Sequence, residues 1–74
     1  MKYEMIREIF NQCSGNQMRD VFISDVNTED PMAYVAEMLK GKEVTLEKED
    51  LPGGGVIVDA DIAGLRQRFT FTPD

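Results

Sequence analysis

Apolar and polar residues alternate along the last third of the chain, and a period of two predicts β-strands. Residues 56–62 and 65–72 show the alternation over long stretches, and residues 43–47 show it around Val44 and Leu46. Proline and glycine interrupt the pattern at residues 51–55, which favours a turn there. The pattern therefore predicts a three-stranded antiparallel meander.

The register of the last hairpin follows from a two-residue turn at Ala63-Gly64. Such a turn sets Ile62 opposite Leu65, Ala60 opposite Gln67, Val58 opposite Phe69 and Val56 opposite Phe71. On the other face it sets Asp61 opposite Arg66 and Asp59 opposite Arg68. Because these opposite-charge pairs arise from a register chosen for its apolar contacts, they support that register.

A helix is predicted over residues 31–40. Asp30 suits the N-cap, Pro31 suits the first helical position, Lys40 complements the dipole and Gly41 suits a left-handed C-terminal cap. One helical face is formed by Met32, Val35, Ala36 and Leu39.

The N-terminal segment allows two interpretations. Residues 18–26 contain the run Val21-Phe22-Ile23, which suits a strand buried on both faces. Residues 2–10 fit a helix by spacing, but they can also pair with residues 18–26 across the polar turn at 11–17. We favour the strand, because the apolar run needs neighbours that satisfy its backbone.

These elements predict one small α+β domain over residues 1–74: an antiparallel sheet with one short helix on a face, in the order β-β-α-β-β-β. The alternative order is α-β-α-β-β-β. A chain of this size buries only about 60% of the surface that its unfolded form exposes, so a large enclosed active site is not expected.

The net charge of −6 comes from residues 20–61, which hold eleven acidic and three basic residues. An acidic field opposes binding to a nucleic-acid backbone. The single cysteine permits no internal disulfide, which favours a reducing compartment, and we expect a cytoplasmic protein. We expect no membrane partner, because no signal peptide or stretch of about 18 apolar residues is present.

The sequence contains no histidine, so most acid–base, nucleophilic and zinc templates lack their usual group. We therefore expect no enzymatic activity, no cofactor and no metal. Asp59-Ala60-Asp61 lacks the further ligands of a calcium loop, and Gly53-Gly54-Gly55 precedes a strand, whereas a phosphate loop precedes a helix.

Cys13 is the candidate reactive thiol, since it lies in a glycine-containing turn and Arg19 follows. We favour the other interpretation, a small, partly buried apolar residue, because nothing adjacent supplies a base or a resolving thiol. Arg66 and Arg68 share one face of the last strand and are candidates for binding a carboxylate or phosphate, although we favour their pairing with Asp59 and Asp61 as the explanation. On the helix, Tyr34 and Met38 are the candidates for an exposed contact.

Three functional hypotheses follow. The first is a non-enzymatic protein-binding or accessory module that acts through a sheet edge or helix face, including self-association into a dimer. The second is a thiol-dependent redox or metal-handling protein centred on Cys13. The third is a sensor of small anionic ligands that uses the arginine-bearing face of the sheet.

Overall fold

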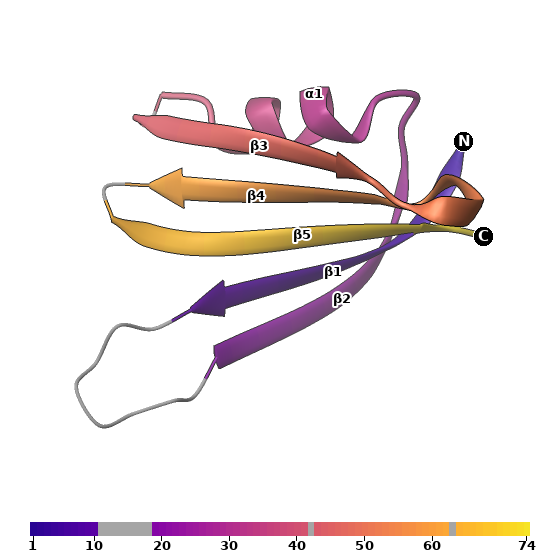
Figure 1. The fold of residues 1–74 in the computed structure, drawn as a ribbon, viewed down its shortest axis with the longest axis horizontal. Coiled ribbons are helices and arrows are strands. Elements are labelled where there is room, and N and C mark those ends of the chain that lie inside the picture. The colour runs from indigo at the N-terminus through magenta and orange to yellow at the C-terminus, as the bar shows by residue number, and fades with distance from the viewer. Residues whose placement is uncertain (11–18, 42, 63) are drawn as a thin grey trace.

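The protein is a five-stranded antiparallel sheet with one short helix (Figure 1). The computed structural model describes residues 1–10, 19–41, 43–62 and 64–74, with Arg19 described by its backbone. The elements are β1 (Lys2–Phe10), β2 (Arg19–Asn27), α1 (Pro31–Met38), β3 (Val44–Asp50), the 3₁₀ turn η1 (Pro52–Gly54), β4 (Val56–Ile62) and β5 (Leu65–Pro73). This order confirms the predicted α+β class and the sequence β-β-α-β-β-β.

The strand order across the sheet is β2-β1-β5-β4-β3, so β2 and β3 form the two edges. Helix α1 packs against β3 and β4 and lies at the β3 side of the molecule in Figure 1. The half of the sheet formed by β1 and β2 extends away from it. No helix in the described residues has the length and apolar character needed to cross a membrane.

The predicted C-terminal register is confirmed. Strands β4 and β5 pair with Val58 opposite Phe69 and with Asp59 opposite Arg68, as the two-residue turn requires. Gly64 has a φ of 88°, a left-handed conformation that glycine adopts without steric cost, and its N–H donates to Asp61 Oδ1 at 3.0 Å. The turn is therefore fixed both by backbone conformation and by an aspartate side chain.

Residues 2–10 form a strand, which decides between the two N-terminal interpretations. β1 lies between β2 and β5, with Ile6 opposite Ile23 on one side and opposite Thr70 on the other. The apolar spacing of residues 2–10 also suits a helix. They form a strand because a central strand satisfies its backbone hydrogen-bonding groups on both sides. The first and last strands of the chain therefore pair with each other in the sheet.

Helix α1 begins as predicted but ends earlier. Asp30 caps it by accepting hydrogen bonds from the N–H groups of Met32 at 3.1 Å and Ala33 at 3.3 Å. The helix spans Pro31–Met38, whereas residues 31–40 were expected. Leu39 is its C-cap, and Gly41 has the left-handed φ that was predicted for a terminating residue.

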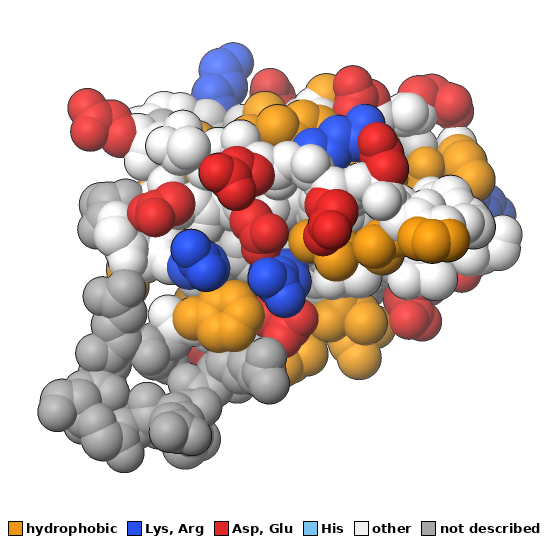
Figure 2. All heavy atoms as spheres, in the orientation of Figure 1, with side chains coloured by type: hydrophobic (Ala, Val, Ile, Leu, Met, Phe, Trp, Pro, Cys, Tyr) orange, Lys and Arg blue, Asp and Glu red, His pale blue; other side chains and the backbone are white. Residues whose placement is uncertain are grey.

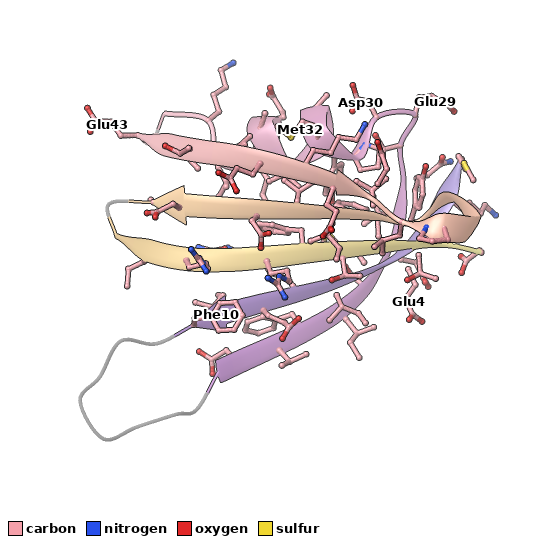
Figure 3. The ribbon with its side chains drawn as sticks, viewed as in Figure 1. Glu4, Phe10, Glu29, Asp30, Met32 and Glu43 are labelled. Carbon is pink, nitrogen blue, oxygen red and sulfur yellow. The ribbon has the colours of Figure 1, made fainter. Side chains whose placement is uncertain are left out.

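The core lies between α1 and the sheet face that it covers, which we call the helix face. Met32, labelled on α1 in Figure 3, packs against this core. Phe71 is its centre: the ring meets Tyr3 edge-on at 5.9 Å between centroids and Tyr34 edge-on at 6.1 Å. Ala36 was predicted on the same helical face as Val35, yet Ala36 is exposed and Val35 is buried. The buried residues are Tyr3, Met5, Val26, Val35, Leu39, Val56, Val58, Ala60, Phe69 and Phe71.

The exposure of the run Val21-Phe22-Ile23 differs from what its sequence predicted. It was predicted to be a strand buried on both faces, yet β2 is an edge strand and the three side chains are 51%, 56% and 66% exposed. The physical reason is the small size of the domain: one eight-residue helix covers only part of one face. These residues therefore lie on the surface.

Candidate interaction edge

The β2 edge presents apolar side chains on both faces of the sheet. Phe22 lies opposite Arg7 and so points to the helix face, beyond the part that α1 covers. Val21 and Ile23 point to the opposite face, which we call the open face. Consecutive apolar residues on an edge strand form a surface that another chain can contact on both sides.

The backbone of Val21 and Ile23 is directed away from the sheet. Thr28 N–H donates to the carbonyl oxygen of Met1 at 3.0 Å, which makes Met1 and Thr28 a hydrogen-bonded pair. Hydrogen-bonded and non-bonded pairs alternate in an antiparallel ladder, so Phe22 bonds β1 while its two neighbours direct their N–H and C=O groups outward. The edge thus offers hydrogen-bonding groups as well as apolar area.

The other edge differs strongly in character. β3 carries charged residues along its second half, and Lys48 Nζ forms an ion pair with Asp50 Oδ1 at 3.6 Å. Charged side chains on an edge strand oppose pairing with another strand. The residues concerned are Glu47, Lys48, Glu49 and Asp50. Of the two edges, β2 is the one whose exposed side chains include a continuous apolar run.

Arg7, on β1, covers the part of the core that lies closest to the β2 edge. Its guanidinium lies 5.4 Å from the centroid of the Phe69 ring, and its Nε donates to Gln67 Oε1 at 3.0 Å. The planar cation covers apolar surface where α1 does not reach, because the face of an aromatic ring attracts a cation. Phe22 lies opposite this arginine on the neighbouring strand β2.

The open face is mostly polar over β4 and β5. Arg68 Nε donates to Asp59 Oδ1 at 2.9 Å, and this hydrogen bond together with the charge of Asp59 raises the pKa of Arg68. An arginine is charged throughout the ordinary pH range at its usual pKa, so the raised pKa does not change the protonation state of Arg68 there. Figure 2 shows acidic side chains in red around a group of basic ones.

Arg66 lies at a shallow hollow of about 160 Å³ on this face. Thr45, Glu47, Asp59 and Asp61 line the hollow with it. Three carboxylates around one guanidinium repel an anion, so the hollow is a poor site for a carboxylate or phosphate ligand. Asp61 binds the Gly64 N–H, and among the described residues it forms no ion pair with Arg66.

The remaining predicted site residues are scattered. Cys13 lies outside the described residues, and Arg19 is placed in β2 by its backbone. Tyr34 is partly buried and packs against Phe71, whereas Met38 is 37% exposed at the end of α1. Within the described ranges, no three acidic or cysteine side chains are grouped as a metal site requires. Of the described candidates, Tyr34 and Met38 lie on α1, whereas Arg66 and Arg68 lie on β5.

Sequence reasoning missed Val21, Phe22 and Ile23 as functional candidates. Their exposure could have been inferred from the sequence. A strand that is apolar on both faces needs an element packed on each face of the sheet, and the sequence predicts only one helix. The run was assigned to the interior on pattern alone.

The Asp59–Arg68 pair is expected to contribute little to stability. Its side chains are partly exposed, so a double-mutant cycle with alanine at both positions should give a coupling of about 0.5–1 kcal/mol in urea unfolding. The same cycle at Asp61 and Arg66 is the control and should give nearly zero. Equal couplings for the two pairs would contradict the geometry.

A scan against protein-family models, a search of curated proteins and a search of solved structures each gave no match to this chain.

Proposed function

We propose that the protein is a non-enzymatic protein-binding module that accepts an extended strand of another chain at the β2 edge. The observation that carries the proposal is the exposure of Val21, Phe22 and Ile23 on an edge strand, where the backbone groups of Val21 and Ile23 are directed away from β1. In strand addition, backbone hydrogen bonds supply affinity and alternating side chains supply specificity.

The charge distribution supports this choice of surface. The chain carries a net charge of −6, and the open face over β3 and β4 holds Glu47, Asp59 and Asp61. The apolar β2 edge lies at the far side of the sheet from that acidic region. A cytoplasmic setting fits the single cysteine and the absence of any internal disulfide.

Capture by cross-linking from the native cytosol tests the proposal with three tagged baits. The wild type and Thr45→Lys should retain the same cross-linked chains, whereas Ile23→Lys should lose at least about nine-tenths of them. Thr45 is exposed on the β3 edge and on the same face as Ile23, so it controls for the added charge.

Amide hydrogen exchange then locates the contact. In the captured complex the amides of Val21 and Ile23 should become protected, while that of Phe22 is already bonded to β1. Retention of all partners by Ile23→Lys, or protection confined to other strands, would rule out the β2 edge as the binding site.

A further inference from the structure

We infer that the strand added at the β2 edge is β2 of a second copy of this chain, paired antiparallel about a twofold axis at Phe22. The inference rests on the proposed function, because it names the occupant of the same edge. A twofold axis normal to the sheet keeps the helix faces of both copies on one side. The two sheets then continue into one.

Backbone geometry permits this alignment. Val21 and Ile23 direct their N–H and C=O groups outward, whereas Phe22 directs its groups to β1. With the axis at Phe22, Val21 of each copy forms a hydrogen-bonded pair with Ile23 of the other. The two Phe22 residues form the non-hydrogen-bonded pair at the centre, where facing side chains lie closest. An axis half a residue away would set opposite faces against each other.

Several alignments place the helix faces of the two copies on the same side. Among them, the pairing of side chains favours the alignment with the axis at Phe22. It is the one that sets every residue of the run Val21-Phe22-Ile23 opposite an apolar residue of the same run. Moving the axis to Ile23 sets Val21 opposite Asp25 and Phe22 opposite Ser24. Moving it to Val21 sets Phe22 opposite Asp20. Both shifts bury charge or polar groups against apolar side chains.

Charge gives independent support for the axis at Phe22. In that register the position of Arg19 in each copy lies opposite Asp25 of the other, so the symmetry creates two facing positions of opposite charge. Asp25 is exposed. Packing of the two open faces is disfavoured by comparison, because Glu47, Asp59 and Asp61 would meet their like.

The two edges of the sheet also favour a closed pair. A head-to-tail contact between β2 and β3 would set the apolar run against the charged residues 47–50 and would continue into a filament. Pairing of β2 with β2 leaves the two charged β3 edges at the ends of the combined sheet, where charge prevents further growth.

Sedimentation equilibrium of the full chain measures the association directly. The wild type and Thr45→Lys should have twice the mass of the 8.4 kDa chain, and Ile23→Lys should have the single mass. Far-UV circular dichroism checks that each variant is folded. A wild type that stays at the single mass up to about millimolar concentration would overturn the inference.

Charge exchange tests the register without depending on Ile23. Arg19→Asp alone and Asp25→Arg alone each create like charges at the facing positions, so each should weaken self-association by about tenfold or more. A mixture of the two variants restores opposite charges at both positions and should form a mixed dimer of wild-type affinity. Both variants stay acidic overall, so net charge does not drive the mixing. Failure of the mixture to recover would overturn the register.

The inference and the proposed function fail in different ways. A monomeric wild type that still captures another protein through Ile23 would exclude the second copy as occupant and keep the proposed function. A monomeric wild type with no partner lost in Ile23→Lys would exclude both. A dimer that Ile23→Lys does not dissociate would place self-association elsewhere on the chain and exclude pairing through β2.

Discussion

Replacement of Phe71 by alanine is expected to lower the free energy of unfolding by about 3–5 kcal/mol. The side chain is 0% exposed, and its ring makes edge-on contacts with both Tyr3 and Tyr34. The substitution removes apolar burial and two aromatic pairs, and it leaves a cavity between α1 and the sheet. A domain of 74 residues has a total stability of roughly 4–11 kcal/mol, so much of it would be lost.

Urea unfolding followed by circular dichroism measures this loss through the midpoint and slope. Leu65→Ala is the matched control, because Leu65 lies on the same strand and is 48% exposed. It should cost less than about 1 kcal/mol. Equal losses for the two variants would contradict the position of the core beneath α1.

Replacement of Val35 by aspartate is expected to lower the free energy of unfolding by about 3 kcal/mol or more. Val35 is fully buried on the face of α1 that contacts the sheet, where the described residues include no buried polar or charged side chain to pair with a carboxylate. The neighbouring Ala36 is exposed on the same helix. Ala36→Asp should therefore stay within about 1 kcal/mol of the wild type, despite its lower helix propensity.

Thermal unfolding of the two aspartate variants provides the comparison. A difference of at least about 2 kcal/mol between adjacent positions on one short helix is explained by burial and not by helix propensity. If Ala36→Asp were the more harmful substitution, the helix would have to be rotated about its axis relative to the described contacts.

The local signals of the fold were readable from the sequence. Alternation around Val58 and Phe69 set both the strands and their register, because a shift of one residue would have turned every apolar side chain to solvent. Asp30 and Pro31 marked the start of α1 through capping chemistry that acts over a few residues. The helix end was less well determined, since Leu39 and Lys40 both have side chains that suit a helix.

The surroundings of the candidate site residues could not be predicted from local sequence patterns. Arg66 and Arg68 lie near each other as expected, but the ion pair of Arg68 and the carboxylates around Arg66 leave little for an anionic ligand. Tyr34 is partly buried, because its ring packs against Phe71 on the sheet. These outcomes depend on contacts between elements distant in the chain, which spacing along a single strand or helix does not specify.

The amino-acid order alone settled the helix start, the last hairpin and the acidic character of the molecule, because propensity, alternation and charge are properties of neighbouring residues. Whether residues 2–10 form a helix or a strand was settled by their pairing with β2 and β5. Which strands became edges was settled by folding in three dimensions. β1 inserted beside β5, and that long-range pairing left β2 with one neighbour and Val21, Phe22 and Ile23 without cover. The same apolar sequence can form a buried central strand or an exposed edge strand. Only the elements packed beside it and over it in the folded protein distinguish the two.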